Sequence, residues 1–109
     1  MNIENAKAQM RKGTLELCIL AIVNKKDCYA SDIINTLKEK NLIVVEGTLY
    51  PLLTRQKNAG LLSYRWEEST QGPPRKYYAL TDQGKKFLIE LDSSWKELVS
   101  VVNSISSKK

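Results

Sequence analysis

The chain has 109 residues, of which 42% are hydrophobic and 27% are charged, as is usual for a single folded domain. It contains no histidine and only two cysteines, Cys18 and Cys28, which excludes histidine-based catalysis, a disulfide framework and a structural zinc site on one chain. Seventeen lysines and arginines against twelve aspartates and glutamates give a net charge of +5, which favours nucleic acid over an anionic membrane surface as the partner.

The first predicted helix covers residues 4–23, in two parts separated at Gly13 and Thr14. Thr14 would cap the second part, with Glu16 in its first turn. The run Leu17–Val23 is apolar on nearly every side, which is typical of a central helix. The run is far shorter than the roughly 20 residues that a membrane helix needs, and the first residues lack the apolar segment of a secretion signal. We therefore expect a cytoplasmic domain with no membrane partner.

Two shorter helices are expected next. The second covers residues 30–40, and its inward-facing residues are Ile33, Ile34 and Leu37. The third covers residues 47–59 and ends at Gly60, which can adopt the left-handed conformation. Pro51 is compatible with this helix because it lies in the first turn, where N–H groups have no helical partner. The inward face of the third helix, spaced i, i+3, i+4 and i+7, consists of Leu49, Leu52, Leu53 and Gln56.

A β-hairpin is predicted after the third helix. Residues 62–67 alternate in polarity, and residues 75–80 are rich in strand-forming side chains. Between them, residues 69–74 read Ser-Thr-Gln-Gly-Pro-Pro, which is typical of a turn. We expect a hairpin with a long tip, in which Trp66 packs against its neighbours. Four tyrosines are expected to be structural, and one of them, Tyr78, has the alternative of reaching solvent. They are Tyr29, Tyr64, Tyr77 and Tyr78.

Thr81 can cap a last helix over residues 82–107, which would be about 39 Å long and longer than so small a core requires. Its apolar residues recur every three or four positions, as in a coiled-coil seam. Such a seam would leave a large apolar stripe in water if the chain were alone, so we expect a homodimer through this helix. The seam consists of Leu88, Leu91, Trp95, Leu98, Val102 and Ile105.

Three helices followed by a β-hairpin is the element order of a winged helix-turn-helix, a mainly α fold with a small β-hairpin (α+β). In this fold the third helix enters the major groove of DNA, and the hairpin lies along the backbone or in the minor groove. We therefore divide the chain into a DNA-binding domain of residues 1–81, a dimerisation helix of residues 82–107 and a frayed tail of residues 108–109.

The outer face of the third helix suits DNA. With the predicted bounds this helix carries Arg55 and Lys57 and no acidic residue that would repel phosphate. Arginine and asparagine can read base edges, while threonine and tyrosine hydroxyls suit phosphate oxygens. For this helix taken alone, an ordinary amphipathic helix with a solvated outer face is the alternative. The outer face consists of Thr48, Tyr50, Pro51, Thr54, Arg55 and Asn58.

Four segments match the motifs of one known family. Residues 46–53 read Glu-Gly-Thr-Leu-Tyr-Pro-Leu-Leu, and residues 74–84 read Pro-Arg-Lys-Tyr-Tyr-Ala-Leu-Thr-Asp-Gln-Gly. Residues 11–16 (Arg-Lys-Gly-Thr-Leu-Glu) and 58–62 (Asn-Ala-Gly-Leu-Leu) extend the match. In this order and at these distances the motifs resemble the PadR family of bacterial transcription regulators. The resemblance covers residues 10–98, and the short last helix is that of the compact subfamily.

The resemblance implies a homodimeric winged-helix repressor that binds an inverted-repeat operator. It also implies DNA contacts by Thr48, Tyr50 and Pro51 at the start of the third helix. In the hairpin it implies contacts by Arg75 and Lys76 to phosphate or to the minor groove. No set of titratable residues has the spacing of a catalytic site, so we expect a protein that is not an enzyme and has no cofactor or metal.

Gln56 departs from the family pattern, which often has leucine after the arginine of the third helix. Its polar side chain weakens the inward face of that helix.

Trp95 has two interpretations. Its spacing alone makes it a core aromatic residue of the dimer seam. In multidrug-binding relatives, however, a tryptophan at the corresponding place faces its dimer mate and stacks on flat aromatic ligands. The resemblance therefore implies a ligand-binding role for Trp95 with a small aromatic effector, and the small side chains of Ser93 and Ser94 would leave room for it.

Two other classes of function remain open. A protein–protein adaptor would show an apolar or mixed-charge outer face on the third helix, whereas the predicted face is polar and free of acid. A ligand-sequestering dimer with weak DNA binding is the other alternative. Of the cysteines, Cys18 is expected to be buried and inert. Cys28 follows Lys25 and Lys26, a setting that can lower the pKa of a thiol, but we do not expect it to act as a redox sensor.

Overall fold

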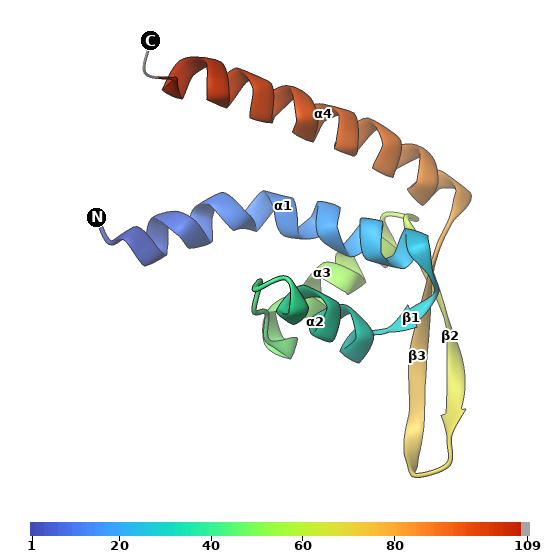
Figure 1. Ribbon diagram of the computed structural model, residues 1–109. Coiled ribbons are helices and arrows are strands. Elements are labelled where there is room, and N and C mark those ends of the chain that lie inside the picture. Colours follow the sequence, from blue (N-terminus) through green and yellow to red (C-terminus); the bar gives the residue numbers. More distant parts are fainter. Residues whose placement is uncertain (108–109) are drawn as a thin grey trace.

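The computed structural model describes residues 1–107 and places four helices and three strands in one α+β domain (Figure 1). The predicted fold class is thus confirmed, and the predicted tail of residues 108–109 lies outside the described residues. The long first and last helices run antiparallel along one side of the molecule, and the hairpin projects away from them (Figure 1). In chain order the elements are α1 (Ile3–Lys25), β1 (Cys28–Tyr29), α2 (Ala30–Glu39), α3 (Glu46–Asn58), β2 (Leu62–Ser69), β3 (Gly72–Leu80) and α4 (Asp82–Ser106).

Helix α1 is unbroken, so the predicted division at Gly13 and Thr14 is wrong. Its cap is Asn2, whose side chain accepts a hydrogen bond from the backbone N–H of Glu4 at 2.7 Å. Thr14 lies inside the helix and does not cap a new one, since its hydroxyl donates back to the carbonyl oxygen of Arg11 at 2.9 Å. A glycine inside a helix costs about 1 kcal/mol, which a helix of 23 residues with a buried C-terminal half can absorb.

The sheet contains one more strand than predicted, because β1 joins the hairpin in the antiparallel order β1-β3-β2. Cys28 and Tyr29 of β1 pair with Tyr78 and Tyr77 of β3. Two residues are too few to show the alternating pattern by which a strand is recognised in a sequence. The strand matters nonetheless, because it fixes the hairpin to the start of α2.

The turn of the hairpin is shorter than predicted, since β2 continues to Ser69 and β3 begins at Gly72. Pro73 and Pro74 therefore lie in a strand and not in the turn. Proline is tolerated there because β1 pairs only with residues further along β3, which leaves the proline side of the strand open.

The core lies where α1, α2 and α3 meet at the base of the hairpin. Tyr78 belongs to it and is 3% exposed, so it is structural as predicted and does not reach solvent. Its ring centroid lies 5.9 Å from that of Tyr64, and burial raises the pKa of its hydroxyl. The predicted inward face of α3 is confirmed, including Gln56, which is 1% exposed. The side chains with least exposure are Ile19, Leu20, Ile33, Leu49, Leu53, Gln56 and Val23.

Thr81 connects the end of α3 to the start of α4. Gly60 ends α3 with a φ of 81°, the left-handed conformation expected for it. The Thr81 hydroxyl donates to the carbonyl oxygen of Gly60 at 2.6 Å and accepts from the N–H of Gly84 at 2.9 Å. The second bond caps α4 as predicted. A Cβ at Gly84 would overlap the carbonyl oxygen of Leu61, so this close approach requires glycine.

Candidate nucleic-acid interface

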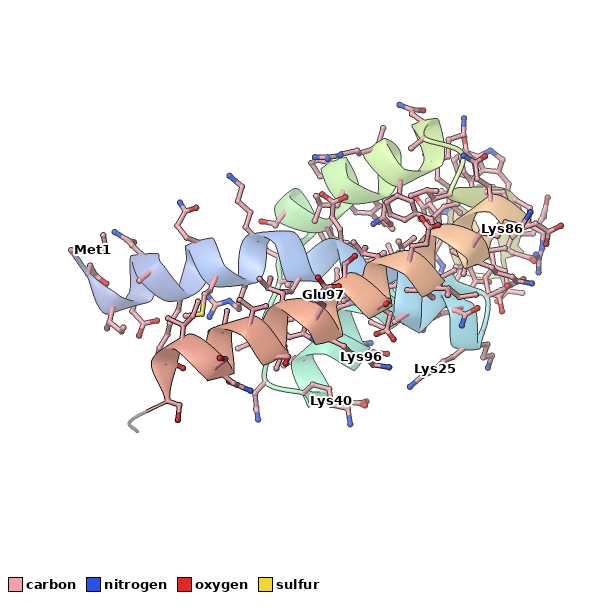
Figure 2. The ribbon with its side chains drawn as sticks, turned by 90° about the horizontal axis from the view of Figure 1, so that it is seen from above. Met1, Lys25, Lys40, Lys86, Lys96 and Glu97 are labelled. Carbon is pink, nitrogen blue, oxygen red and sulfur yellow. The ribbon has the colours of Figure 1, made fainter. Side chains whose placement is uncertain are left out.

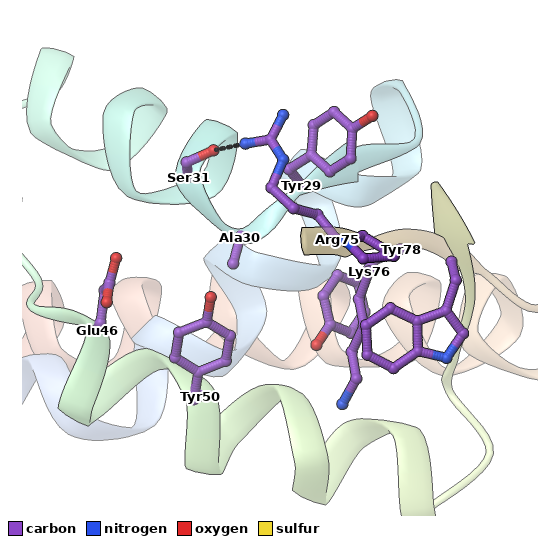
Figure 3. Close-up of a pocket in the computed structure, with 10 residues that line it drawn as sticks. Tyr29, Ala30, Ser31, Glu46, Tyr50, Arg75, Lys76 and Tyr78 are labelled. Carbon is purple, nitrogen blue, oxygen red and sulfur yellow. Dashed lines mark hydrogen bonds between the residues drawn. The ribbon is translucent and has the colours of Figure 1, made fainter. Parts of the chain in front are cut away.

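A cleft of about 340 Å³ separates the N-terminal half of α3 from the hairpin (Figure 3). We call it the wing cleft, and we call the β2–β3 hairpin the wing. Side chains from four parts of the chain line this cleft, namely β1, the start of α2, the start of α3 and the wing. Three of the predicted DNA-binding residues are brought together here with side chains that were not predicted to join them. The residues that line the cleft include Tyr29, Ser31, Tyr50, Trp66, Arg75 and Lys76.

Arg75 is held against the α2 wall of the wing cleft. Its Cζ atom lies 3.9 Å from the ring centroid of Tyr29, and its Nη1 donates to the Ser31 hydroxyl at 3.4 Å (Figure 3). A guanidinium stacked on a ring keeps its in-plane N–H groups available for a phosphate. Tyr29 and Ser31 were missed by the sequence analysis, and they orient this arginine.

The stack continues across the outer face of the wing. The Tyr29 and Tyr77 rings meet edge to face at 4.8 Å between centroids. The Cζ atom of Arg65 lies 4.5 Å from the Tyr77 centroid on the next strand. Arg65 is also ion-paired with Asp27 at 3.5 Å and with Glu67 at 2.8 Å. Arg65, which is neutralised by two carboxylates, thus lies at one end of this stack of rings and arginines. Arg75 lies at the other end, in the wing cleft.

Lys76 extends from the other face of β3, because successive residues of a strand point to opposite sides. Its Nζ atom lies 4.6 Å from the ring centroid of Tyr64 and 5.6 Å from that of Trp66. Two cations therefore line the cleft, each beside an aromatic ring that limits the positions of its side chain.

The outer face of α3 borders the cleft. Tyr50 is 45% exposed, and its ring rises from α3 into the cleft toward Ala30 (Figure 3). The other predicted contact residues of this helix, Thr48, Pro51 and Thr54, are exposed along the same helix. A polar, accessible helix face thus lies beside a cleft lined by cations.

The prediction that this face is free of acid is wrong at one position. Helix α3 begins at Glu46, one residue earlier than expected. Val45 takes the capping position, and a carboxylate in the first turn interacts favourably with the helix dipole. Glu46 is exposed and lines the wing cleft, where its negative charge partly offsets the positive charges of Arg75 and Lys76.

Arg55 is not a free cation on α3, because it is paired with α1. Its Nη1 lies 3.4 Å from Oε1 of Glu16. The neighbouring Gln56 donates its Nε2 to the carbonyl oxygen of the same Glu16 at 3.1 Å. The polar residue that departs from the family pattern therefore ties α3 to α1. The Oε1 atom of Gln56 has no hydrogen-bond partner within residues 1–107.

A second hollow, of about 440 Å³, lies between α1 and α4, which run alongside each other in the view from above (Figure 2). We call it the interhelix groove. Its lining is almost wholly apolar and includes Met10 and Leu17 of α1 and Leu91, Trp95 and Leu98 of α4.

The predicted seam of α4 becomes more exposed along the helix. Leu88 is 9% exposed, Trp95 40%, Leu98 54%, Val102 50% and Ile105 79%. Leu91 packs partly against the core.

The neighbouring lysines do not activate the thiol of Cys28. It is 6% exposed, and its pKa is raised to about 11 by burial, with Asp32 and Asp27 adding to the effect of burial and Lys26 opposing it. Cys18 is half-buried, less than predicted, and burial also raises the pKa of its thiol. Among residues 1–107, no cluster of cysteine, aspartate and glutamate side chains could hold a metal ion.

The helices of residues 1–107 include none with the length and apolar character needed to cross a membrane.

Comparison with known proteins agrees with this architecture. Residues 19–90 match the transcriptional regulator PadR-like family. A PadR-like transcription factor from Bacteroides fragilis is 67% identical, with a TM-score of 0.80 over 94% of this chain and 99% of that chain. A PadR family regulator from Eggerthella lenta is 28% identical, with a TM-score of 0.90 over 98% and 94%. A PadR-like regulator from Bacillus cereus is 36% identical, with a TM-score of 0.79 over 93% and 99%. The chain therefore belongs to the PadR-like family of transcriptional regulators, whose members bind DNA and are not enzymes.

Proposed function

We propose that this regulator is a repressor that binds an inverted-repeat operator as a homodimer and is released from it by a small aromatic ligand. The observation that carries the proposal is the wing cleft. It places the hydroxyl of Tyr50 and the cations of Arg75 and Lys76 beside the exposed face of α3. Hydroxyls and cations are the groups that bind phosphate oxygens and fix the register of a protein on DNA.

Each half of the dimer would read one half of the operator. Helix α3 would enter the major groove with Thr48, Pro51 and Thr54 toward the bases, while the wing follows the adjacent backbone. Arg55 would join these residues only after exchanging its partner Glu16, because the two side chains are paired at 3.4 Å. An arginine that must leave an ion pair contributes less to affinity than a free one.

The homodimer is supported by the length and exposure of α4. The helix has 25 residues, and the second half of its apolar seam is exposed, with Leu98 54% and Ile105 79% accessible. Met10 and Ile3 of α1 are also 76% and 66% exposed. A second copy, related by a two-fold axis, would cover these side chains. Two-fold symmetry would place the two α3 helices about 34–36 Å apart, one turn of DNA, which is why we expect the operator to be an inverted repeat.

The ligand role is supported by the interhelix groove. Trp95 is 40% exposed and faces an apolar hollow whose other wall is α1. Apolar pockets with one large aromatic side chain suit planar ligands. A ligand wedged beside Trp95 would move α4 relative to α1 and change the spacing of the two α3 helices. Such couplings amount to about 1–3 kcal/mol.

The test measures, by gel shift, binding of the purified protein to the DNA upstream of its own gene. Mixed-sequence DNA of the same length is the control. We expect a retarded complex that survives competition by the mixed-sequence DNA, together with a protected inverted repeat in a footprint. Equal affinity for the two DNAs at moderate salt would contradict an operator-binding repressor. Tight ligand binding without any retarded complex would instead support the ligand-sequestering alternative.

A further inference from the structure

Trp66 on β2 is a large aromatic residue that is exposed to solvent. It is 61% exposed, so the expected packing within the wing covers less than half of it. It shares one face of β2 with Leu62 and Tyr64, and burial decreases along this face. Leu62 is 2% exposed, Tyr64 is half-buried and Trp66 is largely uncovered. The indole therefore lies beyond the part of the wing that the core covers.

The neighbours of Trp66 restrict its ring to the wing cleft, which it lines. Tyr64 meets it edge to face, with 5.9 Å between centroids. Lys76 is its partner across the strands, and the ammonium of Lys76 lies 5.6 Å from the indole. The ring is thus placed by two contacts and has a cation beside it.

We propose that Trp66 is a DNA-contacting residue of the wing, with its ring against a deoxyribose and its indole N–H donating to a backbone phosphate. This inference rests on the proposed function. If α3 enters the major groove and the wing follows the adjacent groove, one strand of the duplex passes over the cleft between them. The sugar–phosphate backbone offers apolar sugar faces and anionic oxygens in alternation. An indole matches both, because it has a broad apolar face and one donor with no acceptor.

The charge of the residues that line the wing cleft with Trp66 favours a polyanion over an apolar protein partner. Of the two acidic residues that follow Trp66 on β2, Glu67 is paired with Arg65, and neither Glu67 nor Glu68 lines the cleft. Lys76 lies next to the ring, and Lys57 of α3 lies 5.9 Å from the neighbouring Tyr64 ring. Arg75 lines the same cleft. The carboxylate in the cleft belongs to Glu46, which lies on the other side of Tyr50 from Lys76 (Figure 3). The phosphate position next to Trp66 is therefore on the cationic side of the cleft.

The test compares Trp66→Ala and Trp66→Phe with unchanged Trp66, all in a Trp95→Phe background, so that Trp66 is the only tryptophan of the reference protein. The affinity for a labelled mixed-sequence duplex and for the upstream DNA is measured by anisotropy across a range of salt concentrations. We expect Trp66→Ala to weaken binding about tenfold and Trp66→Phe about threefold, typical of losing a buried ring or one hydrogen bond. Both DNAs should respond alike, because the contact is to the backbone.

Two further readouts separate contact from structure. The slope of affinity against salt should not change, since indole carries no charge, and the melting temperature should stay within the error of the reference. In the reference protein, the mixed-sequence duplex should shield Trp66 fluorescence from acrylamide.

Three results would overturn the inference. The first is an affinity of Trp66→Ala equal to that of the reference protein, together with acrylamide quenching of Trp66 in the reference protein that DNA does not reduce. Because the reference protein would still bind DNA, this result would leave the proposed function intact. The second is a loss of affinity that tracks a lowered melting temperature, which would make Trp66 structural. The third is a reference protein that binds neither DNA, which would remove the proposed function and the inference together.

Discussion

The wing cleft and the interhelix groove have similar volumes, about 340 and 440 Å³, but opposite chemistry. The cleft is lined by Arg75 and Lys76, each positioned against aromatic rings. The groove is lined mostly by apolar side chains, Trp95 among them, with a few neutral polar ones and no charged residue. Salt screens the interactions available in the cleft, whereas burial of apolar surface drives those in the groove. The contributions of the wing cleft and the interhelix groove should therefore respond differently to ionic strength and to charged or apolar substitutions.

The largest effect is expected in the groove, from Leu91→Asp combined with Leu98→Asp. A dimer through α4 would then bury two unpaired carboxylates from each protomer, which costs several kcal/mol, so we expect monomers or insoluble protein and no operator complex. Sedimentation velocity measures the outcome. Ile89→Asp is the matched control, because Ile89 is 71% exposed and lies off the seam. A soluble dimer that retains both aspartates would contradict the seam.

The second effect concerns the cleft, where Arg75→Ala with Lys76→Ala removes both cations of the wing. We expect weaker binding to every DNA sequence, and a salt dependence reduced by about one to two units of slope. Lys85→Ala with Lys86→Ala removes the same charge from exposed positions at the start of α4 and serves as the control. If the two pairs behave alike at all salt concentrations, the wing contributes only its net charge.

The third effect links ligand binding in the interhelix groove to DNA binding at the wing cleft. In a Trp66→Phe variant, Trp95 is the only tryptophan, and planar aromatic cations should quench its fluorescence. We expect operator binding to weaken over the same concentrations, by roughly 5- to 150-fold at saturation for a typical coupling. The native chain is titrated in parallel, because Trp66→Phe itself lowers affinity for DNA. Trp95 emission that is blue-shifted from the start and indifferent to every such ligand would make the ring packed core.

The smallest effect tests one hydroxyl of the cleft. Tyr50→Phe should cost about 1 kcal/mol of binding free energy if the Tyr50 hydroxyl bonds a phosphate, and the melting temperature should not change. Tyr77→Phe, on the outer face of the wing, is the control. Equal affinities of the two variants would show that the Tyr50 ring only packs.

Features set by local periodicity could be predicted from the sequence. The buried face of α3 follows from helical spacing, so Leu49, Leu53 and Gln56 were placed correctly. The cap at Thr81 and the stop at Gly60 follow from side-chain chemistry at single positions. The extra residue at the start of α3, Glu46, was missed because a helix end depends on capping by its neighbours.

Features set by long-range pairing could not be predicted. Arg75 is oriented by Tyr29, which is 46 positions away and reaches it through a two-residue strand. The alternation of β2 correctly placed Trp66 on the same face as Leu62. Whether that face is covered depends on how far α3 and the core extend beneath the wing, which no local pattern records. The pairing of Arg55 with Glu16 is likewise a contact between two helices.

The joint at Thr81 makes α4 a lever arm. The hydroxyl that caps α4 also bonds the carbonyl oxygen of Gly60, so the start of α4 and the C-terminal end of α3 share one side chain. An arm of 25 residues is about 37 Å long, and a tilt of about 5° at the pivot moves its tip by about 3 Å. In reverse, a displacement of several ångströms at the tip reaches α3 as a rotation of only a few degrees. A push applied near Trp95, midway along the arm, turns the pivot about twice as far as the same displacement at Ile105.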